Sequence, residues 1–147
     1  MQTDAVVLLD EAECQALEAF LVDRIYEFNS EATGHFDGKL LGATIRNEAG
    51  DVIAGFNGHT WGGYCEISHL WVDTHHRGRG LGTALLRAAE EQALRRGCFQ
   101  VVLTTYSFQA PGFYASLGYE RKYAIDDKPK GHSSIVFVKL LQGGNGA

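Results

Sequence analysis

A run of alternating glycines and arginines in the middle of the chain has the residue types of an anion-binding turn. Gly78, Gly80 and Gly82 lie in the segment 77–83, and from Leu81 onward apolar side chains recur at the helical spacing i, i+3, i+4 and i+7. The first turn of a helix leaves backbone N–H groups unpaired and carries partial positive charge. Because glycine has no Cβ, a phosphate can approach those groups closely. The spacing therefore predicts a phosphate-binding turn, with a plain flexible loop before a core helix as the alternative.

The glycine spacing disagrees with two common phosphate loops. A Walker loop places Lys and then Ser or Thr after its last glycine, whereas Gly82 is followed directly by Thr83. A dinucleotide-binding loop needs glycine at the position of Thr83 and an acidic residue closing the next strand, which ends in Leu103, Thr104 and Thr105. A nucleotide-binding module is therefore the weaker alternative.

Histidines and cysteines offer other chemistry, but their spacing does not support it. His75 and His76 are adjacent, with no carboxylate or cysteine at ligand spacing, which predicts surface histidines and no metal site. Cys14, Cys65 and Cys98 are odd in number and widely spaced, as expected of free thiols in a reducing compartment.

Length and composition predict one globular domain over residues 1–147, with a core at about 5–140 and a disordered tail at about 142–147. The 147 residues are 45% hydrophobic and 21% charged, and the net charge is −5. A negative net charge argues against general affinity for nucleic acid or for anionic membranes. We see no signal peptide, and the apolar runs are too short to span a bilayer. We therefore expect a cytoplasmic domain with no nucleic-acid or membrane partner.

The first half of the chain predicts one helix among four strands. An apolar run at 5–9 predicts a strand, and Asp10 with Glu13 forms a capping-box start for a helix to about residue 29. A polar, glycine-containing loop follows at 29–38. Residues 40–46 and 52–59 then predict a hairpin, and 64–72 predicts the strand that leads into the glycine turn.

The second half continues with helices and strands in turn. The helix that begins at the glycine turn should end at Gly97, and a strand at 99–105 should run parallel to the strand before that helix. Pro111 opens a short helix that ends at Gly118. Strands at 119–123 and 133–140 complete the chain.

Two motifs in this order resemble the GNAT superfamily of N-acetyltransferases. Arg77, Gly80 and Gly82 match the signature Arg/Gln-x-x-Gly-x-Gly/Ala, and the segment 110–119 resembles the box Ala-x-x-Phe/Leu-Tyr-x-x-x-Gly-Phe/Tyr with Tyr114 at its tyrosine. One departure is Ser107, which stands where the family often has Asn. The resemblance covers about residues 5–140 and implies an α/β (α+β) fold. That fold is a mixed, mostly antiparallel twisted sheet of six to seven strands, with a central parallel β-α-β unit and flanking helices.

The resemblance also implies a binding site for acetyl-CoA. Backbone N–H groups of the glycine turn would hold the pyrophosphate, arginine side chains would add charge, and the end of the preceding strand would pair with the pantetheine arm. The implied cofactor-binding residues are Leu70, Val72, Arg77, Gly78, Arg79, Gly80, Gly82, Thr83 and Ser107.

The catalytic residues implied are an acid and a base. Tyr114 matches the family's usual general acid, which protonates the departing thiolate. Glu66 is the leading base, because strict alternation places it on the same strand face as Leu70 and Val72. His69 is better tuned for the task but points to the other face unless a bulge shifts the register, and a water chain is a third option. Cys65 should face away from the cofactor, which argues against an acyl-enzyme.

The predicted activity is therefore transfer of an acetyl group from acetyl-CoA to a primary amine, by direct attack in a ternary complex and without a metal. The acceptor, a small-molecule or peptide amine, is not identified by the sequence. A homodimer is common in the family, and the last strand is the contact we would expect. The alternative function is a non-catalytic CoA-binding sensor or interaction domain of the same fold.

Overall fold

The computed structural model describes residues 4–142 and contains two compact units, divided between Phe36 and Asp37. The first unit holds helix α1 (Glu11–Thr33). Its predicted capping box is confirmed, because Asp10 Oδ1 accepts from the backbone N–H of Glu13 at 2.8 Å and Glu13 Oε1 accepts from the N–H of Asp10 at 3.0 Å. The helix runs past the predicted end near residue 29 and stops at Gly34, which has φ 79°.

The predicted strand at 5–9 is wrong, because these residues form no strand. Their apolar character suits a strand, but a strand also needs a hydrogen-bonded partner. All six strands that the structure describes belong to one sheet of the second unit, and none of them pairs with residues 5–9. Residues 143–147, the main part of the expected disordered tail, lie outside the described residues.

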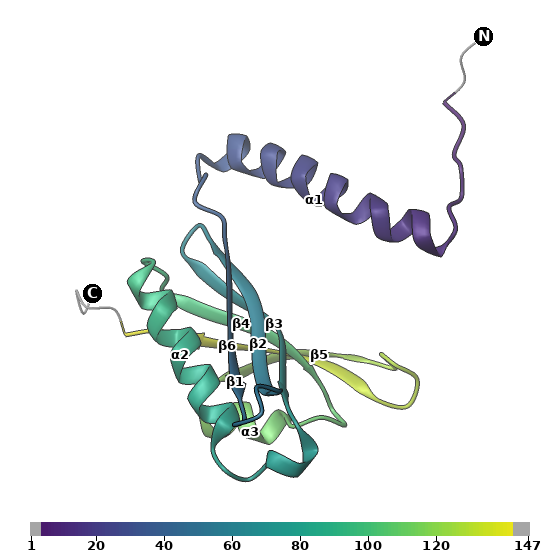
Figure 1. Cartoon of the computed structure of the whole chain (residues 1–147). Helices are drawn as coiled ribbons and strands as arrows, with labels where there is room; N and C mark the ends of the chain where they lie inside the picture. Colours follow the sequence, from purple (N-terminus) through teal and green to yellow (C-terminus); the bar gives the residue numbers. More distant parts are fainter. Residues whose placement is uncertain (1–3, 143–147) are drawn as a thin grey trace. The chain divides into compact units, whose positions relative to one another are not determined.

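The second unit is built on a six-stranded sheet with the order β1-β2-β3-β4-β6-β5 (Figure 1). Only β3 and β4 are parallel, and every other pair is antiparallel. The predicted mixed, mostly antiparallel fold is confirmed. The strands are β1 (Lys39–Arg46), β2 (Val52–Trp61), β3 (Tyr64–Val72), β4 (Gln100–Tyr106), β5 (Glu120–Asp126) and β6 (Ser133–Leu140).

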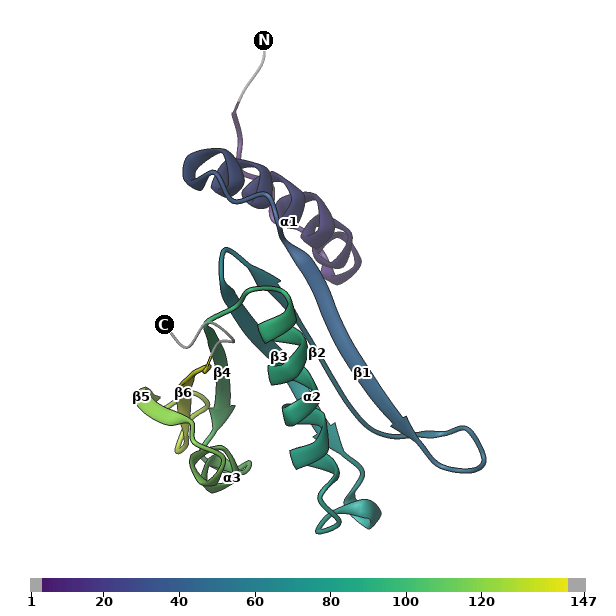
Figure 2. The ribbon, with the colours of Figure 1, turned by 90° about the vertical axis from the view of Figure 1, so that its left-hand side faces the viewer.

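Two helices and a short 3-10 turn complete this unit, namely α2 (Leu81–Arg95), α3 (Pro111–Ser116) and η1 (Thr74–His76). Helix α2 lies along one face of the sheet (Figure 2) and buries Leu85, Leu86, Ala89 and Ala93 there. The strand side chains under α2 form the core of the unit, and include Cys65, Ile67, Val101, Leu103, Ile135 and Phe137. Among the helices of residues 4–142, none combines the length and the apolar character needed to cross a membrane.

A bulge in β3 overturns the strict alternation expected for this strand. Against β2, Ile67 pairs with Gly58 and His69 pairs with the adjacent Asn57, so Ser68 is an extra residue. Ile67 and Leu70 therefore both face the core beneath α2. Glu66 and His69, which alternation placed on opposite faces, share the face away from α2.

The last strand is not an open edge of the sheet. Strand β6 lies between β4 and β5, and the two sheet edges are β1 and β5. The expected contact of a homodimer through this strand would therefore have no free backbone edge to use.

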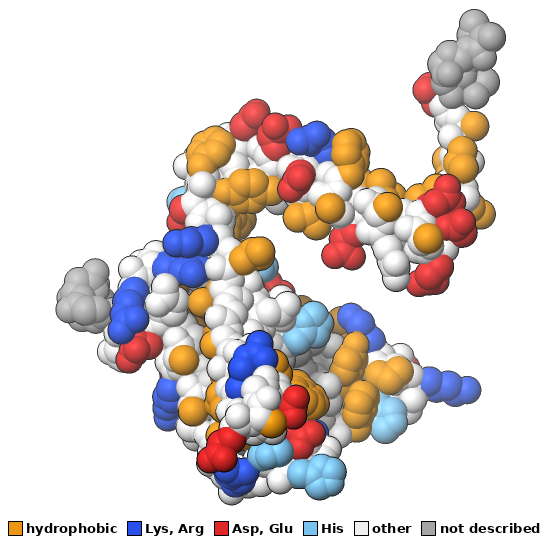
Figure 3. Space-filling view, viewed as in Figure 1, with side chains coloured by type: hydrophobic (Ala, Val, Ile, Leu, Met, Phe, Trp, Pro, Cys, Tyr) orange, Lys and Arg blue, Asp and Glu red, His pale blue; other side chains and the backbone are white. Residues whose placement is uncertain are grey.

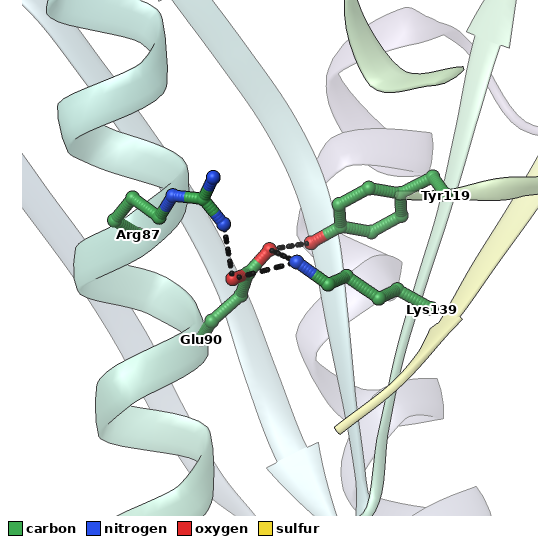
Figure 4. A network of polar contacts seen from close by, with 4 residues as sticks. All are labelled: Arg87, Glu90, Tyr119 and Lys139. Atoms are coloured by element: carbon green, nitrogen blue, oxygen red, sulfur yellow. Dashed lines mark hydrogen bonds and ion pairs between the residues drawn. The ribbon is translucent and has the colours of Figure 1, made fainter. Parts of the chain in front are cut away.

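A buried carboxylate joins α2 to the end of the sheet (Figure 4). Glu90, which is 8% exposed, accepts from the hydroxyl of Tyr119 at 2.7 Å and from Nζ of Lys139 at 3.2 Å to each oxygen. Arg87 Nη1 lies 3.4 Å from the same carboxylate. Burial and the contact with Glu90 raise the pKa of Tyr119, so its hydroxyl stays protonated and donates.

Candidate active site

A gap opens in the sheet where the two parallel strands separate. The β3–β4 ladder ends at Ile67 and Leu103, although β3 continues to Val72 and β4 continues to Tyr106. A cavity of about 1130 Å³ is lined by these two strand ends, the glycine turn and α3. Because the final part of β3 has no ladder partner on this side among the described residues, an extended ligand can lie along it in place of a strand.

The glycine turn forms one wall of this cavity, as the sequence predicts. Gly78 and Gly80 have φ values of 76° and 78°, a region that other residues rarely adopt. Gly80 is the N-cap of α2 and makes no side-chain capping bond, so the first N–H groups of the helix are not capped by a side chain. A Cβ on Gly82 would lie 3.2 Å from the ring of Phe113, so glycine also lets α3 pack closely over this turn.

The segment before the glycines is held by Asp73. Its carboxylate accepts from the backbone N–H of His75 at 3.0 Å and contacts Nδ1 of His76 at 2.8 Å. The hydrogen bond with His76 is the largest of the effects that lower the pKa of Asp73. Arg77 Nε donates to the carbonyl oxygen of Val72 at 3.2 Å, which ties the turn to the end of β3.

Tyr114 lies in the wall of the cavity, on α3. Its side chain is buried at 9% exposure, and its ring packs edge-on against Phe113 and Tyr119 at centroid distances of 5.1 and 6.0 Å. Burial raises the pKa of Tyr114 above its ordinary value. The phenol is therefore protonated at neutral pH, which is the state a general acid requires.

The two candidate bases lie on the face of the sheet opposite α2. His69 lines the cavity, and its Nδ1 lies 2.9 Å from Oδ1 of Asn57. Glu66 is half-buried, pairs in register with His59 and does not line the cavity. Burial, followed by the negative charge of Glu66, raises the pKa of Tyr64. The bulge thus brings both candidates to one face, where the sequence had separated them.

Most of the predicted cofactor-binding residues line this cavity, namely Leu70, Val72, Arg77, Gly78, Gly80, Gly82 and Thr83. Arg79 is exposed and does not line it. Ser107 does not line it either, and its hydroxyl accepts from the N–H of Ser133 at 2.9 Å. Cys65 faces the core beneath α2, and burial raises its pKa to about 12, so its thiol is not a ready nucleophile.

The sequence offers Tyr64, Trp61 and Tyr106 as aromatic residues that could line an acceptor pocket, and of these three Tyr106 lines the cavity. Trp71, Tyr106 and Phe108 line it, and Phe108 is 54% exposed. Trp71 and Phe108 were missed, because in the sequence they resemble ordinary strand and loop aromatics. Only the tertiary gap between β3 and β4 shows that they surround one space.

The model of the acetyltransferase (GNAT) family matches residues 7–119 of the chain. The chain belongs to the GNAT family. Blasticidin-S acetyltransferase from Streptomyces morookaense is 40% identical to this GNAT protein over 95 residues, which cover 64% of this chain and 70% of that one. The crystal structure of an acetyltransferase from Bacillus cereus is similar with a TM-score of 0.75 at 28% identity, and covers 94% of this chain and 98% of that one.

One solved structure of the same fold was determined in complex with coenzyme A. An aminoglycoside 6'-N-acetyltransferase that was crystallised with coenzyme A shares the fold with a TM-score of 0.59 at 16% identity, and covers 69% of this chain and 72% of that one. The glycine turn and the gap beside it fit such a ligand, because they combine uncapped N–H groups with an unpaired strand. Within residues 4–142, no three His, Cys, Asp or Glu side chains group together as a metal site would require.

Proposed function

We propose that this GNAT protein transfers the acetyl group of acetyl-CoA to a primary amine by direct attack within a ternary complex. The observation that carries the proposal is the single cavity that runs from the glycine turn, along the unpaired end of β3, to Tyr114. An anionic ligand with a long extended arm suits these features in that order. The family and its acetyltransferase relatives support the same chemistry.

The glycine turn would bind the part of the cofactor that does not react. Backbone N–H groups of Gly78, Gly80, Gly82 and Thr83 would donate to the pyrophosphate, at roughly 1.5–3 kcal/mol for each bond to a charged group. The side chain of Arg77 is already directed to the end of β3 by its bond to Val72, and adds positive charge beside the turn. Leu70 and Val72 would offer their backbone to the pantetheine arm.

The chemical step needs one proton delivered and one removed. The neutral amine nitrogen attacks the thioester carbonyl carbon, a C–N bond forms, and the C–S bond breaks. The departing thiolate takes the hydroxyl proton of Tyr114, whose raised pKa keeps that proton in place until then. The nitrogen loses its own proton to a base.

The base would come from the sheet face opposite α2. Core side chains fill the space beneath α2, so the acceptor would approach from the side that carries His69 and Glu66. His69 lines the cavity, and a hydrogen bond from its Nδ1 to Asn57 would leave Nε2 free to accept a proton. Glu66 would act through a water molecule. Comparing Glu66→Gln with His69→Gln assigns the role to the residue whose loss lowers kcat more.

Calorimetry with acetyl-CoA and with CoA, followed by thiol release in the presence of an amine panel, tests the proposed function. Binding together with amine-dependent release is the expected result. Binding without release from any amine would favour the non-catalytic CoA-binding domain. Failure of both ligands to bind at high micromolar concentration would overturn the proposal.

A further inference from the structure

Three aromatic rings pack together beside the cavity, and two of them, Tyr106 and Phe108, line it. Tyr106 ends β4, Phe108 lies in the loop before α3, and His132 lies in the loop between β5 and β6. The rings of Tyr106 and Phe108 stack at 5.2 Å with an interplanar angle of 6°, and His132 meets Phe108 edge-on at 5.0 Å. We call Tyr106, Phe108 and His132 the aromatic ledge.

The backbone on both sides holds the aromatic ledge in place. The side-chain oxygen of Gln109 accepts from the N–H of Tyr106 at 2.8 Å, which closes the loop under Phe108. Ser107 and Ser133 exchange two bonds, from the N–H of Ser107 to the carbonyl of Ser133 at 2.8 Å and from the N–H of Ser133 to the hydroxyl of Ser107 at 2.9 Å. A ring that is fixed in advance loses little conformational freedom when a ligand stacks on it.

The aromatic ledge lies on the acceptor side of the sheet. Leu103 and Thr105 of β4 are buried at 2% and 3% exposure, and Leu103 belongs to the core beneath α2. By alternation Tyr106 faces the other way, as do His69 and Trp71 on β3. Figure 3 shows hydrophobic side chains gathered next to histidines on the face of residues 37–142 seen in that view.

The charges around the cavity restrict the ligand further. No aspartate or glutamate is among the described residues that line it, and the side chains there that can carry charge at neutral pH are His69, His76 and Arg77. A polyamine or an aminosugar with several positive charges would meet no counter-charge in this lining. A ligand with one amine on a flat, uncharged body brings a single charge into this lining and is therefore disfavoured less by that absence.

From the stacked rings and the absence of acidic lining residues, we propose that the acetyl acceptor carries a planar aromatic ring that binds on the aromatic ledge, close to its single primary amine. This inference rests on the proposed acetyl transfer and names the substrate class of the same site. Phe108 is 54% exposed, which leaves surface that such a ring can contact, and Tyr106 and His132 keep Phe108 in position.

Initial rates with saturating acetyl-CoA and three amines test the substrate class, with acetylated product measured by mass spectrometry. The amines are 2-phenylethylamine, its saturated counterpart 2-cyclohexylethylamine, and spermidine. We expect kcat/KM for the phenyl compound to exceed that for the cyclohexyl compound by about three- to tenfold, the range of an aromatic pair. Spermidine should be the poorest acceptor.

Two variants separate the aromatic ledge from other exposed aromatics. Phe108→Leu keeps an apolar side chain and removes the ring, so kcat/KM for 2-phenylethylamine should fall about three- to tenfold while KM for acetyl-CoA stays unchanged. Phe99→Leu is the matched control, because Phe99 is 57% exposed, directly precedes the first residue of β4 and does not line the cavity.

Three outcomes would overturn the inference. Equal rates for the phenyl and cyclohexyl amines, or preference for spermidine, would leave acetyl transfer standing without an aromatic acceptor. A rise in KM for acetyl-CoA in Phe108→Leu would assign the aromatic ledge to the cofactor. Acetylation of no amine by a protein that binds acetyl-CoA would remove the proposed function itself, and the inference with it.

Discussion

Replacing Glu90 by alanine should destabilise residues 37–147 by about 3–5 kcal/mol, the usual cost of removing one partner of a buried charge pair. The carboxylate is 8% exposed and accepts bonds from Tyr119 and Lys139. Without it, the Lys139 ammonium, on a side chain that is 20% exposed, keeps its charge with no carboxylate beside it. The Tyr119 hydroxyl, on a residue only 3% exposed, loses its acceptor as well. For a chain of this length the loss corresponds to roughly 10 °C in Tm.

Urea unfolding followed by tryptophan fluorescence measures this loss of stability in the second compact unit of the chain, which contains Glu90. Both tryptophans of the chain, Trp61 and Trp71, lie in strands of the sheet. Glu91→Ala is the control, because Glu91 is the next residue of α2 and its ion pair with Arg95 is 68% exposed on both sides. An exposed pair of this kind contributes only about 0.3–0.5 kcal/mol.

A triple variant distinguishes an unpaired charge from lost packing. Glu90→Leu with Lys139→Met and Tyr119→Phe removes every polar group of the Tyr119–Glu90–Lys139 contact at similar volume, and it should recover most of the stability lost in Glu90→Ala. If Glu90→Ala costs no more than Glu91→Ala, the network of Figure 4 does not stabilise the fold and the reasoning is refuted.

Three further predictions concern the site and its surroundings. Tyr114→Phe should lower kcat about a hundredfold and leave the Kd for acetyl-CoA nearly unchanged; unaltered turnover would remove Tyr114 from the acid role. Gly80→Ala and Gly97→Ala impose similar strain, because their φ values are 78° and 82° and both have open space at Cβ. Both should lower Tm, but only Gly80→Ala should raise the Kd for CoA in calorimetry, by about tenfold. Burial raises the pKa of Cys65 from 9.0 to about 12, so the unfolded chain releases this proton first, and stability should fall between pH 9 and 12. Across that range the denaturation midpoint of Cys65→Ala should decline less steeply with pH than that of the unaltered protein. Cys14→Ala, which removes an exposed thiol, should decline as steeply as the unaltered protein.

The fold was largely predictable because its local signals agree with its tertiary structure. The capping box at Asp10, the glycine stop at Gly97 and Pro111 at the start of α3 each act within a few residues, and each lies where the sequence placed it. The strand expected at 5–9 was wrong for the opposite reason. Strand formation depends on a partner far away in the chain, which an apolar run does not reveal.

The site was predictable in its phosphate-binding part and less so in its chemical part. Glycines at 78, 80 and 82 act through their own backbone, so their spacing carries the information. The side of the sheet on which Glu66 and His69 lie depends instead on the bulge of β3 against β2. The hydroxyl of Ser107 accepts a hydrogen bond from the N–H of Ser133, which belongs to a strand far away in the chain. Both contacts join residues that are distant in the sequence, so strict alternation along a single strand could not predict them.

The extra residue in β3, Ser68, changes which residues of the strand face the core. Upstream of Ser68, odd-numbered residues such as Cys65 and Ile67 face the core, and downstream the even-numbered Leu70 and Val72 do. If Ser68 were instead paired in ordinary alternation, without the bulge, the part of β3 after it would present its opposite side to α2. The imidazole of His69 and the indole of Trp71 would move beneath α2, while two aliphatic side chains would replace them at the mouth of the cavity. Deletion of Ser68 would keep the present facings, because Ile67 and His69 would then be consecutive residues that alternate. The surface on which an acceptor could be recognised therefore depends on how the strand accommodates Ser68, which neither sequence motif records.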